Sequence, residues 1–247
     1  MRGVVKSFGA HVVLNGVDFE VRSGETVALL GPSGTGKSVL LKHIVGLLLP
    51  DSGEVLVDGL SVPHLSRDSI TRLRQRIGYA FQMGALFDSL TVYENIRLGI
   101  TDEKLYRNRT YCDDRVATCL KMVNLSPDVG RKMPGELSGG MKKRVGIARA
   151  IAGKPRYLLY DEPTSGLDPV NADAMDALIE QLQDELRVTS VVVSHDVRGS
   201  FRVADRIALL HHGKIHKVGT PDEFKHAKDE VVREFLDRDF QLLGAGF

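Results

Sequence analysis

A glycine-rich segment at residues 31–38, GPSGTGKS, has the residue types and spacing to hold a chain of phosphates. It matches the pattern G-x-x-x-x-G-K-[ST], follows an expected strand at 26–30 and opens an expected helix at Lys37. Glycines let several backbone N–H groups point at one anion, and the helix dipole adds positive potential. Lys37 would reach the β- and γ-phosphates, and Ser38 would ligate Mg²⁺. The alternative is a glycine-rich turn between core elements.

Two adjacent carboxylates, Asp161 and Glu162, come directly after an apolar run at 157–160. That run is expected to be a strand, and open α/β sheets place their ligands at the carboxyl ends of strands. Asp161 could hold Mg²⁺ there, usually through water, while Glu162 could polarise an attacking water. An Asp-Glu pair at a strand end is otherwise a solvated turn, and the phosphate loop upstream favours the functional interpretation.

A second group able to bind an anion lies at 137–141, LSGGM, just before an expected helix at 142–151. A serine and two glycines at a helix start offer a hydroxyl, open N–H groups and the dipole to one anion. Alone, this would be a simple helix cap. His195 alone would more often be structural, and His211 and His212 lack further metal ligands at suitable spacing, so that a hairpin turn is the better interpretation.

Short runs of β-branched residues alternate with helical patterns along the chain, which indicates an α/β sheet. Between Met83 and about Gly135 the strand signals disappear and polar helical patterns take over. Thr220 is expected to cap a closing helix that has Pro221 at its first position. Strands are expected at 17–22, 26–30, 54–58, 77–81, 157–160, 188–193, 207–210 and 214–218, and helices at 37–48, 66–76, 91–98, 113–123 and 142–151.

The composition excludes several classes of protein. Lys and Arg number 33 and Asp and Glu 32, so the net charge is +1, and no nucleic-acid partner is expected. Cys112 and Cys119 are too few for a disulfide framework, and reduced, half-buried thiols on one helical face are expected. The longest apolar run, 44–49, is far short of the ~18 residues of a membrane span. The reducing cytoplasm is therefore the expected compartment.

In their order, these motifs resemble those of the ATP-binding-cassette (ABC) ATPase subunits, over essentially the whole chain. The resemblance implies a P-loop NTPase (RecA-like) α/β core with antiparallel strands and an inserted helical subdomain. It implies one domain over 1–247: a core of 1–82 and 152–222, a helical subdomain of 83–151 and a helical tail of 223–247. The matching segments are the Walker A loop at 31–38, the Q-loop at Gln82, the signature at 137–141, Walker B at 159–162, the D-loop at 165–168, the switch histidine His195 and an adenine-stacking aromatic, Phe8.

The same resemblance implies a head-to-tail homodimer that encloses two ATP molecules, each between the Walker A loop of one copy and the signature of the other. Glu162 would be the general base, His195 would hold the γ-phosphate and the lytic water, and Asp168 would connect the two sites. Mg²⁺ would be bound by Ser38, Gln82 and Asp161. Gln82 would also belong to the catalytic residues, because it would sense Mg²⁺ and relay the occupancy of the site to a partner. The residues expected at the nucleotide are Phe8, Gly31, Pro32, Ser33, Gly34, Thr35, Gly36, Lys37, Ser38, Val39, Ser138, Gly139, Gly140 and Asp168.

Two residues depart from the family pattern, since Met141 replaces the usual signature glutamine and Phe8 lacks the hydroxyl of the commoner tyrosine. A narrower resemblance, to the ATPases of MCE-linked (Mla-type) phospholipid transport, lies in 81–90, 137–144, 194–197 and 233–236. It implies a membrane permease, an MCE lipid-binding protein and a small STAS-type protein as partners, on the cytoplasmic face of the inner membrane. The alternatives are another ABC importer or exporter, a DNA-repair-type ABC ATPase, a nucleotide-dependent interaction module and a small-molecule P-loop kinase.

Overall fold

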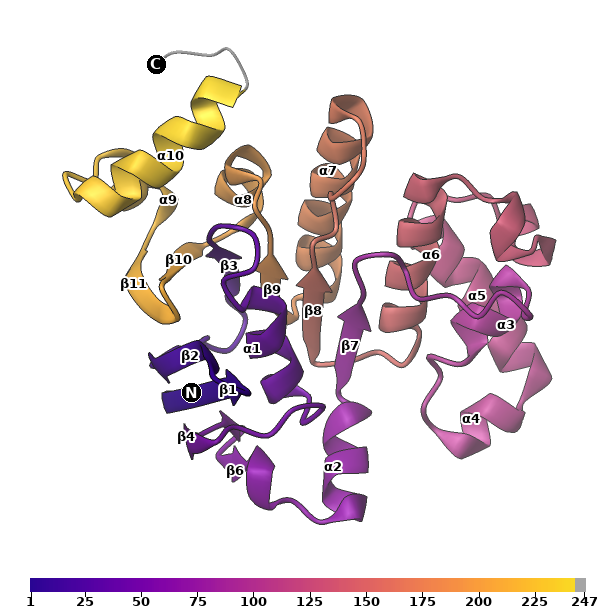
Figure 1. Cartoon of the computed structure of the whole chain (residues 1–247). Helices are drawn as coiled ribbons and strands as arrows, with labels where there is room; N and C mark the ends of the chain where they lie inside the picture. The colour runs from indigo at the N-terminus through magenta and orange to yellow at the C-terminus, as the bar shows by residue number, and fades with distance from the viewer. Residues whose placement is uncertain (243–247) are drawn as a thin grey trace. The chain divides into compact units, whose positions relative to one another are not determined.

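The computed structural model describes residues 1–242, so the last part of the predicted tail, 243–247, lies outside the described residues. The chain, drawn in Figure 1, divides into two compact units. The first contains residues 1–70 together with the chain from Val191 onward, and the second contains Thr71–Ser190. The expected division into a core, a helical subdomain and a tail stays a prediction.

The amino-terminal part of the first unit is an antiparallel sheet in the order β2-β1-β4. Its strands are β1 (Arg2–Phe8), β2 (His11–Val17) and β4 (Ser52–Glu54). The expected strand at 17–22 is wrong, because the strand ends at Val17 and a loop follows. The Asp18 carboxylate accepts a bond from the Gly3 N–H at 2.8 Å, and the Glu25 carboxylate accepts one from the Arg22 N–H at 2.7 Å. In this loop, side-chain carboxylates accept the bonds that the carbonyls of a neighbouring strand would accept in a sheet.

The expected strand at 54–58 is also wrong as a single element. It divides into the end of β4 and the short strand β5 (Leu56–Val57), which pairs with β6 (Leu60–Ser61) in a separate hairpin. Val55 between them is buried, and its carbonyl accepts a bond from the Val62 N–H at 2.8 Å. This contact draws Val55 inward and ends the first pairing. A 3-10 turn, η1 (Val62–His64), follows.

The phosphate loop is preceded by β3 (Thr26–Leu30), whose five residues are all buried. β3 pairs in parallel with β10 (Arg206–His211), and β10 pairs antiparallel with β11 (Lys214–Gly219). β9 (Thr189–Val193) is the neighbour of β3 on its other side in the sheet order. The predicted hairpin turn at His212 and Gly213 is confirmed. A buried, parallel strand explains why the run at 26–30 is continuously apolar after Thr26.

The helices of the first unit cover this sheet. α1 (Lys37–Ile44) ends four residues before its predicted limit, because Gly46 at φ +65 turns the chain. α2 (Arg67–Arg74) begins in this unit. α8 (Val197–Val203), α9 (Pro221–Lys225) and α10 (Glu230–Leu242) follow β9 and the hairpin. Thr220 caps α9 in a capping box with Glu223, as predicted.

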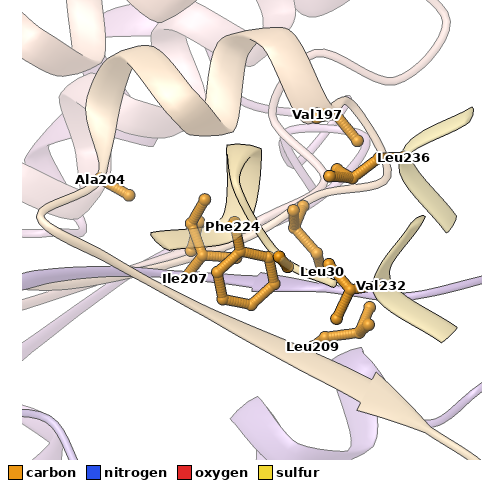
Figure 2. Packing of buried hydrophobic residues seen from close by; sticks show 10 residues of the cluster. Leu30, Val197, Ala204, Ile207, Leu209, Phe224, Val232 and Leu236 are labelled. Atoms are coloured by element: carbon orange, nitrogen blue, oxygen red, sulfur yellow. The ribbon is translucent and has the colours of Figure 1, made fainter. Parts of the chain in front are cut away.

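One apolar cluster holds α8, α9 and α10 to β3 and β10 (Figure 2). Phe224 of α9 is 1% exposed and lies among side chains from both strands and from α8 and α10. The strand that leads into the phosphate loop is therefore fixed by burial on this face. The labelled members are Leu30, Val197, Ala204, Ile207, Leu209, Phe224, Val232 and Leu236.

The second unit contains a parallel pair of strands, β7 (Ile77–Ala80) and β8 (Tyr157–Asp161). α6 (Gly139–Ala152) packs on β7, and a Cβ at Gly78 would meet Leu158 at 2.6 Å as well as the Ala150 carbonyl. The other helices are α3 (Val92–Arg97), α4 (Glu103–Arg107), α5 (Arg109–Met122) and α7 (Pro169–Leu186), with 3-10 turns η2 (Pro127–Arg131) and η3 (Pro134–Glu136). The predicted loss of strands after Met83 is confirmed up to β8.

Both cysteines are on α5, seven residues apart on one face, and both are 0% exposed. They are free thiols, but the expectation that they are half-buried is wrong, since the helix turns that face fully into the core. Among the described residues, no helix combines the length and the apolarity that crossing a membrane requires.

Candidate functional site

The phosphate loop of the first unit has a backbone that only glycine can adopt at two positions. Gly31 has φ +153, and a Cβ there would overlap the Leu210 carbonyl oxygen. Gly36 has φ +100, and a Cβ there would lie 2.6 Å from Cγ1 of Val13. Atoms of neighbouring strands thus lie in close contact with the loop at both of its ends. Glycine is therefore required at these two positions by packing as well as by binding.

Lys37 lies over this loop. Its Nζ donates to the carbonyls of Gly31 at 2.7 Å and Pro32 at 3.1 Å, and the side chain is 5% exposed. The first turn of α1 holds no acidic residue, so that the turn itself adds no negative charge at the positive end of the helix. The cation and the helix end together give this loop the electrostatics of an anion site.

His195 is exposed and follows β9, as predicted, with Ser194 between the strand and the histidine. The turn that carries it is well anchored: the Ser194 N–H donates to the Leu29 carbonyl at 3.3 Å, and the Ser194 hydroxyl accepts from the Asp196 N–H at 2.9 Å. Asp196 in turn caps α8. The imidazole is thus held at the carboxyl end of a buried strand.

Phe8 ends β1 with 48% of its surface exposed, so the ring has an open face for stacking. The Nζ of Lys6 lies 5.7 Å from the ring centroid and forms a 2.7 Å ion pair with Asp51. The bond from Lys6, followed by one from the Ser7 N–H, lowers the pKa of Asp51. These contacts fix the strand end that presents Phe8.

In the second unit, Asp161 ends β8 and is 7% exposed. The hydroxyl of Tyr79 donates to its Oδ2 at 2.9 Å. Burial, then the charge of Asp161, raises the pKa of Tyr79, so the phenol stays neutral and acts as the donor. Tyr79 is not among the predicted site residues. The feature that could have identified Tyr79 is its place on β7, the strand next to β8, where Tyr79 pairs in register with Leu159.

Glu162 has φ +52, a left-handed conformation that a residue with a side chain rarely adopts. Its carbonyl accepts three bonds: from the Ser165 N–H at 3.3 Å, the Ser165 hydroxyl at 3.1 Å and Nζ of Lys143 at 3.0 Å. Sequence reasoning identified Glu162 but neither this backbone conformation nor Lys143.

The signature segment begins α6, three residues earlier than the predicted helix. Ser138 and Gly139 are exposed, and the Ser138 hydroxyl accepts a bond from the Met141 N–H at 3.3 Å as the helix cap. A Cβ at Gly140 would lie 3.7 Å from Cδ2 of Leu167, so this segment lies beside the predicted D-loop of the same chain. The exposed cap leaves the helix end accessible to an anion.

Asp168 is explained locally as the cap of α7. Its Oδ1 accepts from the Asn171 N–H at 3.1 Å, and its Oδ2 accepts from Nδ2 of Asn171 at 2.6 Å. These two bonds lower the pKa of Asp168. The structure therefore shows a structural role for Asp168, while the predicted link between two nucleotide sites stays a prediction.

Gln82 is exposed and follows β7, as predicted, and the loop after it is tied to α6. Arg149 donates to the carbonyls of Gly84 and Ala85, both at 2.8 Å. Gly146 lies so close that a Cβ there would be 2.9 Å from Cα of Gly84. Met83 is 77% and Phe87 56% exposed, which places these two side chains on the surface and not in the helical core.

The fold and these segments define a P-loop NTPase that also carries a signature segment at the start of a helix, α6. The model of the family described as "ABC transporter" matches residues 14–165, and the chain belongs to this family. It is an ABC ATPase that binds ATP with Mg²⁺. Hard oxygen donors of the kind that Mg²⁺ prefers occur in each unit taken by itself, as the hydroxyl of Ser38 in the first and the carboxylate of Asp161 in the second.

Several curated relatives are transport ATPases. The chain is 39% identical to the sulfate/thiosulfate import ATP-binding protein CysA of Caulobacter vibrioides, over 100% of this chain and 73% of that protein. It is 37% identical to the probable ribonucleotide transport ATP-binding protein mkl of Mycobacterium leprae, over 96% of this chain and 68% of that protein.

Solved structures agree with the fold. A dimeric, post-hydrolysis form of the ATP-binding cassette MJ0796 with ADP and Pi matches at TM-score 0.81 and 33% identity, over 89% of this chain and 97% of that chain. CbiO1 of Clostridium perfringens, part of the ABC transporter complex cbiONQ, matches at TM-score 0.82 and 30% identity, over 99% and 97%.

Proposed function

We propose that this ATPase drives a membrane transporter by closing, as a head-to-tail pair of copies, on two ATP molecules and opening after hydrolysis. The observation that carries the proposal is the presence of two anion sites on one chain. Residues 31–38 carry a lysine, whereas 138–140, at the exposed start of α6, carry none. A site without its own cation is explained if it completes the phosphate site of a second copy.

The proposed roles follow from the chemistry of each side chain. The loop of 31–39, with Lys37, binds the phosphates, and Ser138, Gly139 and Gly140 bind the γ-phosphate of the partner copy's ATP. Phe8 stacks on the adenine. When bound, Mg²⁺ offsets phosphate charge, and Ser38, Gln82 and Asp161 would hold it.

Glu162 takes the proton of the attacking water as general base. His195 holds the γ-phosphate and orients that water. Asp168 links the two sites through the D-loop, beyond its role as a cap. The γ-phosphate favours the closed pair, and its loss after hydrolysis reverses that preference, which is the difference between states that a conformational cycle requires.

A permease would convert this cycle into transport, with the ATPase bound at the cytoplasmic face of the inner membrane. The exposed Met83 and Phe87, held by Arg149 beside the Q-loop, support a docking place for such a partner. As the kind of transporter, we favour an importer. This choice is supported by the names of the relatives, one for sulfate/thiosulfate import and the other for ribonucleotide transport.

A lipid transporter is the second candidate. It is supported by the similarity of 81–90, 137–144, 194–197 and 233–236 to the ATPases of MCE-linked phospholipid transport. In that case an MCE lipid-binding protein and a STAS-type protein would belong to the complex.

Purification of the chain with its membrane partners separates the two candidates. An importer predicts a co-purified permease and stimulation of ATP hydrolysis by a small solute with its binding protein. A lipid transporter predicts phospholipid in the mass spectrum and an MCE protein among the partners. A chain that hydrolyses ATP but recovers no membrane protein would contradict both.

A further inference from the structure

Lys143 is a buried cation that has no role in the proposed mechanism. It is the fifth residue of α6 and is 7% exposed. Burying an ammonium group costs free energy unless its partners compensate. Burial lowers the pKa of Lys143, and the charge of Glu162 raises it in part. A lysine kept in such a place needs an explanation from its contacts.

Its ammonium group meets the turn that carries Glu162. Nζ donates to the Glu162 carbonyl at 3.0 Å and to the Ser165 hydroxyl at 3.1 Å, and that hydroxyl donates to the same carbonyl at 3.1 Å. The Ser165 hydroxyl and N–H together already provide the carbonyl with two donors. Lys143 is therefore not required to satisfy a buried acceptor.

The additional bond from Lys143 stabilises a strained backbone conformation at Glu162. Glu162 at φ +52 is in a region that a residue with a Cβ rarely adopts, and it persists only where surrounding contacts fix it. The direction of the Glu162 side chain depends on this backbone conformation, because φ sets where Cβ points.

We propose that Lys143 is a positioning residue that holds the left-handed turn at Glu162 and joins it to α6. Because α6 begins at the signature segment, a shift of the amino end of α6 would be transmitted to the Glu162 turn through the side chain of Lys143. This inference rests on the proposed role of Glu162 as the base.

The test replaces Lys143 with Met, which keeps the length and removes the charge and the donors, in the ATPase purified with its partners. We expect kcat to fall by about 10- to 100-fold, the effect of a misplaced catalytic group, while the affinity for Mg·ATP changes by less than about twofold. Lys142→Met, at the adjacent and half-buried lysine, is the matched control and should keep the kcat of the parent.

A double variant distinguishes positioning from general damage. In the Glu162→Gln background, Lys143→Met should cause no further loss of the single-turnover rate, since the group that it positions is already disabled. If Lys143→Met does not fold, Lys143→Gln, which keeps one donor at a shorter reach, carries the same test with an intermediate kcat.

A parent-like kcat in these variants, a loss of ATP affinity in place of kcat, or a full additional loss in the double variant would overturn the inference. Failure of the base assignment looks different: Glu162→Gln alone would then hydrolyse ATP at the parent rate, whatever Lys143→Met does.

Discussion

At the scale of the residue, the second unit shows how much of a site depends on backbone conformation. Asp161 and Glu162 are neighbours, yet Asp161 ends a buried strand and Glu162 turns at φ +52. The sequence predicts both carboxylates from their place after an apolar run. It does not predict the left-handed turn, because one of the contacts that hold it comes from Lys143, 19 residues away.

Glu162→Gln keeps the size of the side chain and removes the basic oxygen. We expect ATP binding to be retained and turnover to fall by about 10²–10⁴-fold, the usual contribution of a positioned base. Steady-state hydrolysis and equilibrium nucleotide binding, measured on one preparation, check both parts. Parent-like hydrolysis in this variant would refute the base assignment.

Tyr79→Phe removes the hydrogen bond to Asp161 and little else. We expect the Mg²⁺ concentration for half-maximal hydrolysis to rise by about tenfold, as for a lost bond to a charged group, while ATP binding in EDTA is unchanged. Tyr93→Phe is the control, since it removes a 2.7 Å bond to Asp113 on the exposed surface. An equal Mg²⁺ response in both variants would speak against a role for Tyr79.

Cys119 provides a test that depends on pH. Burial raises the pKa of Cys119 from its ordinary value of 9.0 to about 11, so the folded state holds a proton that the unfolded state releases. Its contribution to stability is present below pH 9 and is lost as the pH rises to about 11, by up to about 1.4 kcal/mol per pH unit. Denaturant unfolding of the parent and of Cys119→Ala from pH 8 to 11 measures this; parallel curves would contradict the burial effect.

At the scale of the element, helix caps set by nearby residues follow from the sequence, whereas a strand limit set by a distant contact does not. Thr91 and Thr220 cap their helices as local patterns indicate, since capping depends on residues three apart. The expected strand at 17–22 failed because Asp18 binds Gly3, 15 residues away, and a local pattern does not contain that contact.

Two of the phosphate-loop glycines, Gly34 and Gly36, give a prediction at this scale. Gly36→Ala should lower the free energy of unfolding by about 1–3 kcal/mol more than Gly34→Ala, because a Cβ at Gly36 meets Val13 whereas one at Gly34 meets nothing within 4 Å. Both positions have positive φ, so the comparison isolates the clash. Equal losses would show that backbone strain alone matters.

At the scale of the whole molecule, the predicted groups are divided between two units. The phosphate loop, His195 and Phe8 belong to the first unit, and the carboxylates and signature segment belong to the second. The alternation of strands and helices was enough to predict the α/β class and a helical segment after Met83. The proposed composite site involves a second copy, and a single sequence contains no direct record of such a contact.

The most direct test of the shared site is the mass of the Glu162→Gln protein in solution with Mg·ATP. It should rise from 27.2 kDa to twice that value, because ATP is bound and not cleaved. Ser138→Arg in the same background should bind ATP with the same affinity and remain at the mass of one chain, since the arginine fills the exposed start of α6. A dimer that forms equally well in the Ser138→Arg protein would contradict the account.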